Sequence, residues 1–215
     1  IFCSVEEGAR GERATEWGLV DESIPRSEFW EKVQTRAEAF SKKTDRPNDG
    51  KGVSLTPLKK VVSEDKLDYS TLSISLDKAK RIATVNIIAP ETVQTVTAAE
   101  LDSLDADYWP LRFARELDDA ILHLRTNEPE LGIIIFKSQG NSDNVMAYDK
   151  QLQEHQFHWL IREITLYLKR TFKRVDVTSR TFLTLVEPGS CFCGFLAEFI
   201  FASDRSYMLS GTFSD

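Results

Sequence analysis

The chain has 215 residues, of which 41% are hydrophobic, which is enough for one large core or two smaller ones. Its formal net charge is -7 and its pI about 5.1, and no run of Lys and Arg is free of acids, so nucleic acid is excluded as an expected partner. No apolar run approaches the roughly 20 residues that a membrane span needs, and the charge-rich first residues are not those of a signal peptide.

Residues 1–41 are predicted to be helical. Gly18 follows a helical pattern at 12–17 and is a typical residue just beyond a helix end. Ser27 is predicted to cap a second helix. The apolar residues of that helix recur at spacings of three and four, which predicts one buried face made of Phe29, Val33, Ala37 and Phe40.

Residues 42–66 are predicted to be a linker. Their first part, residues 42–52, is rich in turn-forming residues and almost free of apolar ones, and this change of composition indicates a domain boundary. The chain begins without Met and ends at Asp215, directly after an apolar phrase at residues 207–209. We therefore expect it to be an internal piece of a longer protein.

From residue 67 onward the pattern changes to strands alternating with helices. Apolar residues alternate in two segments, 69–76 and 82–88, which predicts a hairpin with residues 77–81 as its loop. The elements expected next are a helix at 111–125, a buried strand at 131–137, one long helix at 144–174, a strand at 182–186, a helix near 194–202 and a strand at 206–209.

Two of these helices carry apolar stripes that are predicted to face the core. The stripes are Phe113, Leu117, Ile121 and Leu124 in the first helix, and Phe157, Ile161, Ile164, Leu168 and Phe172 in the long one. Strands that alternate with helices favour parallel pairing with helical crossovers, so the predicted fold class is α/β.

The segment from the strand at 182–186 to Asp204 points most directly to chemistry. Pro188 and Gly189 end the strand, and a helix that carries Glu198 follows near Gly194. A helix that opens straight after a strand presents free backbone N–H groups, which can hold a developing enolate oxygen. The pattern resembles the crotonase (enoyl-CoA hydratase/isomerase) superfamily, in which such a helix, with a Glu and a later Asp, builds half of an oxyanion hole.

The resemblance extends over most of the chain. Residues 11–26 are similar to the closing part of a crotonase unit, so residues 1–41 are identified as the C-terminal helices of a first crotonase-like unit. Residues 67–215 are identified as the first part of a second unit. Further collinear phrases resemble the tandem members that open the ring of an aryl-CoA thioester, and they lie at residues 7–11, 16–22, 55–58, 109–111, 115–128, 176–180 and 187–192.

This resemblance implies a ring-opening lyase of aerobic benzoate degradation. Such an enzyme converts 2,3-epoxy-2,3-dihydrobenzoyl-CoA and water to a 3,4-didehydroadipyl-CoA semialdehyde and formate. The implied partners are the aryl-CoA substrate and a second copy of the chain in a homodimer, with no nucleic acid and no membrane. The resemblance implies no metal and no redox cofactor, because CoA is part of the substrate.

The second unit lacks the glycines that its family uses for catalysis. The Phe-x-x-Gly-x-Asp motif is not recognisable at residues 138–144, and Phe195 and Leu196 stand where the family has Gly-Gly-Gly. We therefore expect a degenerate unit that supports catalytic carboxylates located upstream of Ile1. Two alternatives stay open: an enoyl-CoA hydratase or isomerase with Glu198 as acid/base, and a non-catalytic assembly module.

The three cysteines (Cys3, Cys191 and Cys193) are too few for a disulfide framework, and a reducing cytoplasm is the expected location. Cys191 or Cys193 could be a nucleophile, but small buried thiols are common and no His is near them in the sequence.

Three charged groups have both a functional and a structural interpretation. His155 and His158 with Glu154 could bind a metal or could form a solvated face. The acids within residues 115–119 could be catalytic or could form an ion-pair network. The cations within residues 169–174 could receive the phosphates of CoA or could complement the negative end of a helix.

Overall fold

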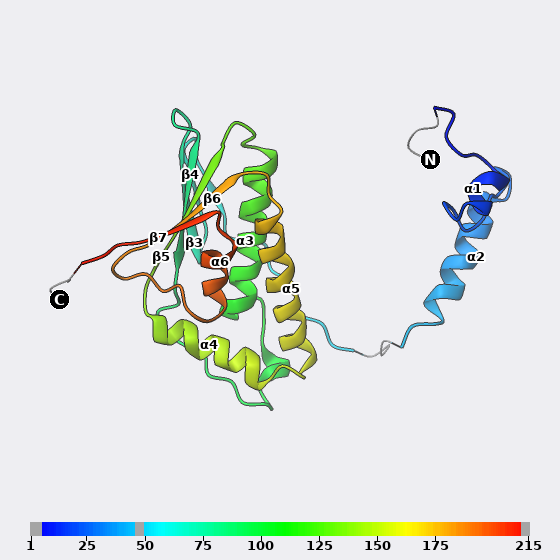
Figure 1. Ribbon diagram of the computed structural model, residues 1–215. Helices are drawn as coiled ribbons and strands as arrows, with labels where there is room; N and C mark the ends of the chain where they lie inside the picture. Colours follow the sequence, from blue (N-terminus) through cyan, green and yellow to red (C-terminus); the bar gives the residue numbers. More distant parts are fainter. Residues whose placement is uncertain (1–5, 46–49, 212–215) are drawn as a thin grey trace. The chain divides into compact units, whose positions relative to one another are not determined.

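The computed structural model describes residues 6–45 and 50–211, and the chain divides into two compact units, residues 1–50 and 51–215 (Figure 1). Cys3 lies outside the described residues. The division falls inside the predicted linker. Each unit is described by itself.

The first unit contains two helices, α1 (Glu12–Glu16) and α2 (Phe29–Ser41). The prediction that Ser27 caps α2 is wrong, because the N-cap position is held by Glu28 and no side chain caps the helix there. The reason is a turn just before the helix, in which the backbone N–H of Glu28 donates to the carbonyl of Pro25 at 3.0 Å. Ser27 is part of that turn.

Gly18 ends the first helix as predicted. Its φ of 67° is a conformation that glycine adopts without a steric penalty. The N–H of Gly18 donates to the carbonyl of Thr15 at 3.0 Å, and that of Leu19 donates to the carbonyl of Ala14 at 2.9 Å. This pair of bonds is the Schellman motif, which satisfies the last carbonyls of a helix.

The predicted apolar face of α2 is not covered within this unit. None of the residues of α2 is buried, and Trp30 is 77% exposed. A polar contact with Glu22 holds the preceding segment to the helix, since its carboxylate accepts from Arg36 at 3.1 Å and lies 3.7 Å from Lys32.

The second unit is built on one seven-stranded sheet whose strands follow chain order. The strands are β1 (Val61–Val62), β2 (Lys66–Asp68), β3 (Leu72–Asp77), β4 (Ile82–Ile88), β5 (Ile133–Gln139), β6 (Thr181–Val186) and β7 (Arg205–Met208). Pairing is antiparallel from β1 to β4 and parallel from β4 to β7. The predicted hairpin is thus confirmed as β3 and β4, and the α/β class is confirmed.

The predicted linker boundary at residue 66 is too late. Residues 61–62 and 66–68 pair with each other at the edge of the sheet, so the last part of the predicted linker belongs to the second unit. The turn between them is fixed by backbone bonds: the N–H of Ser63 donates to the carbonyl of Lys66 at 2.8 Å. Strands of two and three residues are too short to carry an apolar alternation that sequence reasoning could detect.

The helices of the second unit are α3 (Trp109–Thr126), α4 (Ser142–Glu154), α5 (Trp159–Asp176) and α6 (Glu198–Ala202). Helices α3 and α5 run side by side along one face of the sheet, and α4 follows the end of β5 (Figure 1). The predicted core stripe of α3 is confirmed, since its four residues are fully or almost fully buried: Phe113, Leu117, Ile121 and Leu124.

The prediction of one long helix at residues 144–174 is wrong. The chain leaves the helical path at residues 155–158 and starts α5 at Trp159. Asp102 fixes this start, because its carboxylate accepts from the indole N–H of Trp159 at 3.0 Å and lies 3.2 Å from Nε2 of His158. Phe157, which was predicted to be in the core, lies in the break and is 93% exposed.

A buried carboxylate joins α3 to the turn before β3. Glu116 is 1% exposed and accepts four hydrogen bonds. They come from the backbone N–H and the hydroxyl of Ser70, at 3.3 and 2.6 Å, and from those of Thr71, at 2.7 and 2.5 Å. Because a buried charge is costly unless it is hydrogen-bonded, this residue fixes the position of the helix against the sheet.

Candidate functional site

The loops that follow β4, β5 and β6 meet at the carboxyl edge of the parallel strands, where open α/β sheets bind ligands. Backbone bonds connect them: the N–H of Ala89 donates to the carbonyl of Gln139 at 2.9 Å, and the N–H of Gly140 donates to that of Gly189 at 3.1 Å. The amide of Asn144 adds a donor to the carbonyl of Pro90 at 2.8 Å. The three loops therefore form one connected layer.

A polar pocket of about 460 Å³ lies between the loop after β4 and the start of α3. Its charged and hydrogen-bonding side chains include Glu91, Asp107, Arg112 and Tyr148. The guanidinium of Arg112 lies 3.6 Å from the carboxylate of Asp107, and the Tyr148 hydroxyl accepts from the N–H of Gln94 at 3.0 Å. The pocket thus combines carboxylates with a cation and a phenol, which are groups that can orient a polar substrate and transfer protons.

Sequence reasoning did not predict these four residues. They come from separate segments of the chain, and each type is common on protein surfaces. The available signal was the position of Glu91, which lies in the loop after the strand that ends at Ile88, at an edge where ligands of α/β sheets bind.

The loop at residues 138–144, from which one oxyanion-hole amide was expected, contacts residues 189–191, which precede the second expected segment at residues 194–197. The N–H of Gly140 is committed to Gly189, and the N–H of Cys191 donates to the hydroxyl of Ser138 at 3.0 Å. Leu196 is fully buried, and the ring of Phe195 packs against Trp109 with their centroids 5.8 Å apart. Leu196 therefore fills space in the core, whereas Phe195 is only partly buried and also lines an open groove that contains Glu198.

This groove, of about 850 Å³, lies between α4, α5 and α6. Glu198 is the first residue of α6 and its side chain is exposed. Its apolar neighbours in the groove include Leu152, Phe172 and Phe201. The role of Glu198 as acid/base stays a prediction, and the polar pocket at the edge of the sheet does not include this residue.

The other candidate residues have structural partners. Burial raises the pKa of the Cys191 thiol and also that of Cys193, which keeps both thiols protonated and unsuited to nucleophilic attack. His155 and His158 lie in the break between α4 and α5, not on a helical face. Within the described residues, no group of three or more His, Cys, Asp and Glu is placed to hold a metal ion.

The acids of α3 form contacts with neighbouring elements, which supports the interpretation as an ion-pair network. Asp118 pairs with Arg174 of α5, and the Tyr167 hydroxyl donates to it at 3.3 Å. Asp119 pairs with Lys60 at 2.8 Å and accepts from the Tyr69 hydroxyl at 2.7 Å.

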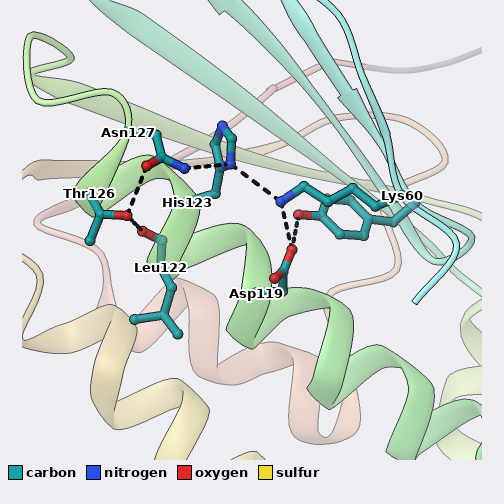
Figure 2. Close-up of polar contacts among 7 residues, drawn as sticks. Lys60, Asp119, Leu122, His123, Thr126 and Asn127 are labelled. Atoms are coloured by element: carbon teal, nitrogen blue, oxygen red, sulfur yellow. Dashed lines mark hydrogen bonds and ion pairs between the residues drawn. The ribbon is translucent and has the colours of Figure 1, made fainter. Parts of the chain in front are cut away.

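Lys60 is the centre of a polar cluster at the C-terminal half of α3 (Figure 2). Besides Asp119, its ammonium lies 3.3 Å from Nδ1 of His123, and the amide of Asn127 lies 3.0 Å from the same nitrogen. Both neighbours are donors, so Nδ1 accepts and the imidazole is neutral with its proton on Nε2. Burial, and then the charge of Lys60, lower the pKa of His123.

This cluster predicts a loss of stability in mild acid. Since the folded state binds a proton on His123 less readily than the unfolded state, stability is complete above the unfolded pKa of about 6.5 and falls as the pH decreases below it. His123→Gln is expected to flatten this part of the pH profile. Urea unfolding midpoints between pH 7.5 and 5 measure it, with His155→Gln as the control that keeps the wild-type slope. An unchanged slope for His123→Gln would contradict the assignment.

The comparisons with known proteins agree with the sequence motifs. No model of a known protein family matches the chain. A benzoyl-CoA-dihydrodiol lyase of Aromatoleum evansii is 43% identical over 209 residues, which cover 97% of this chain. The chain spans 38% of the length of that relative. The sequence resemblance that the collinear phrases indicate is thereby confirmed, to a benzoyl-CoA-dihydrodiol lyase.

Two solved structures are similar to part of this chain. An enoyl-CoA hydratase from Geobacillus kaustophilus HTA426 has a TM-score of 0.42 and 14% identity, covering 66% of this chain and 47% of its own. A Streptomyces coelicolor A3(2) structure of the same enzyme name has a TM-score of 0.39 and 10% identity, covering 76% and 50%. Within the residues that the structure describes, no helix is long and apolar enough to cross a membrane.

Proposed function

We propose that this chain is part of an aryl-CoA lyase that opens the ring of 2,3-epoxy-2,3-dihydrobenzoyl-CoA. Water is consumed, and the products are formate and a 3,4-didehydroadipyl-CoA semialdehyde. The observation that carries the proposal is the 43% identity to a benzoyl-CoA-dihydrodiol lyase, which extends over 97% of the chain. Identity of this extent favours a shared reaction over a shared fold alone.

Within that enzyme, we assign a supporting role to the second unit. The support for this role is the bond from the Gly140 amide to Gly189 and the replacement of the family's glycines by Leu196, which is fully buried, and Phe195, which packs against Trp109. A thioester carbonyl needs two free donors placed at its oxygen. The catalytic carboxylates are accordingly assigned to residues outside this chain, in keeping with the 38% of the relative that it spans.

The proposal includes a cytoplasmic homodimer that needs neither a metal nor a redox cofactor. Polarisation of the thioester carbonyl and proton transfer by carboxylates are sufficient for water addition and release of formate. Light scattering coupled to size-exclusion chromatography measures the mass of the assembly, and a monomer at micromolar concentration would remove the dimer from the proposal.

The activity test uses the full-length gene product and the epoxide of benzoyl-CoA. Formate release, followed with formate dehydrogenase, and formation of the semialdehyde thioester, followed by mass spectrometry, are expected in equal amounts. A parallel reaction with crotonyl-CoA tests the alternative in which Glu198 is the acid/base. Hydration of crotonyl-CoA that Glu198→Gln abolishes, together with no formate from the epoxide, would replace the proposed reaction with that alternative.

A further inference from the structure

A hollow of about 530 Å³ lies between the C-terminal halves of α3 and α5, away from the polar pocket described above. Five of its seven lining residues are cations, and no acid lines it. The lining residues are Arg125, Leu166, Lys169, Arg170, Lys173, Arg174 and Val177. Such a concentration of positive charge is unexpected in a chain whose net charge is -7.

Not all of this charge is neutralised by neighbouring groups. Arg174 pairs with Asp118, and Lys173 pairs with Asp176 at 2.6 Å. The guanidinium of Arg170 lies over the ring of Tyr167, 4.6 Å from its centroid, and so keeps its charge. In the part of the chain that the structure describes, the side chains of Arg125 and Lys169 form no ion pair or hydrogen bond.

Helix dipoles account for only part of the cluster. Cations in the last turn of a helix are favoured by its negative end, which applies to Arg125 in α3 and to Lys173 and Arg174 in α5. Lys169 and Arg170 lie further from the end of α5, where the dipole effect has faded. The hollow therefore holds more positive charge than the two helix ends require.

The cationic hollow adjoins the groove along α5, because Lys169 and Lys173 line both, and the groove's lining also includes three acids, Asp149, Asp176 and Glu198. On the groove side the lining includes Leu168 and Phe172. A ligand that fits both surfaces carries anionic groups at one end and an apolar group at the other.

We propose that the hollow lined by Arg125, Lys169 and Arg170 binds the phosphate groups of a diphosphate-bearing ligand. Arginine and lysine are the residues that recognise phosphate oxygens, through charge-assisted hydrogen bonds. The identity of the ligand rests on the proposed function. If that function holds, the ligand is the CoA portion of a thioester, and the hollow binds it at a distance from the reacting carbonyl. The groove then accommodates its apolar part.

The test is a titration of the full chain with CoA and with inorganic pyrophosphate, measured by calorimetry at low and high NaCl. Both are expected to bind at one site, to compete with each other, and to bind more weakly as salt screens the charges. The double variant Arg125→Gln/Lys169→Gln is expected to weaken binding about tenfold, in keeping with the loss of charge-assisted contacts. Arg162→Gln is the matched control, because it removes a charge from α5 outside the hollow. It should change the dissociation constant less than about twofold.

Several results would overturn this site. They are the absence of binding of either probe, equal affinities of wild type and the double variant, or CoA binding that pyrophosphate does not displace. Competition at the hollow, together with no formate release when the full-length gene product is given the epoxide, would reject the lyase and retain a diphosphate site. Formate release without either probe binding at the hollow would retain the lyase and reject the site.

Discussion

Phe199→Ala is expected to destabilise the second unit by about 4 kcal/mol, which is a large part of the stability of an ordinary domain. Phe199 is 1% exposed and its ring meets those of Phe136 and Phe172, with centroids 4.6 and 5.3 Å away. These rings come from β5 and α5, so Phe199 connects the sheet to its helical layer. The substitution removes buried apolar surface and also leaves a cavity. Urea unfolding followed by circular dichroism measures the loss of unfolding free energy.

Phe201→Ala is the matched control for this substitution. Phe201 lies in the same short helix, two residues later, but it is 77% exposed. Its truncation is expected to change the unfolding free energy by less than about 0.5 kcal/mol. Equal losses in the two variants would mean that α6 does not pack on the sheet as described.

Gly140→Ala is expected to cost about 3 to 4 kcal/mol, for two separate reasons. The φ of Gly140 is 125°, a conformation that side chains with a Cβ rarely adopt and that costs about 1 to 3 kcal/mol. An added Cβ would also lie 2.7 Å from the Cβ of Ala89, so the loops after β4 and β5 would have to separate. Their separation would weaken the bond from Gly140 to Gly189 as well.

Gly132→Ala provides the comparison, because this glycine directly precedes β5 and an added Cβ would meet nothing within 4 Å. We expect its unfolding free energy to stay within about 1 kcal/mol of the wild type, since a glycine replaced without strain often gains slightly in stability. A Gly140→Ala variant as stable as Gly132→Ala would contradict the close approach of the two loops.

The parts of the fold with a regular apolar pattern could be predicted from the sequence. In α3, residues at helical spacing became the fully buried stripe that contains Phe113 and Leu117. In β3, the alternation of Leu72, Ile74 and Leu76 matched the buried face of the strand. In both elements the local pattern and the tertiary packing favour the same structure.

The break between α4 and α5 could not be predicted, because its cause is a distant contact. Residues 155–158, where the helix breaks, contain neither Gly nor Pro, so neither of the usual helix breakers opposes a continuous helix. The carboxylate that fixes the start of α5 is Asp102, 57 residues before Trp159. Apolar residues recur at helical spacing both before and after the break, so the sequence pattern indicated one continuous helix.

The candidate site was predicted only in part for the same reason. The sequence located the loops at residues 138–144 and 187–194, and the structure brings them together. It gave no indication that Lys60 would lie beside Asp119 and His123, which are 59 and 63 residues away in the chain. Long-range polar contacts of this kind leave no periodic trace in a sequence.

The uncovered helix α2 has a consequence for motion. A helix of 13 residues, none of them buried, is held by little more than its own backbone bonds, and helices of this length are marginal in water. In a preparation of this chain alone, its amide protons should therefore exchange with solvent on a far shorter timescale than those of β4 and β5, which are released only when the sheet opens. Slow exchange in α2 once the full-length gene product is used would then report directly that upstream residues cover this helix.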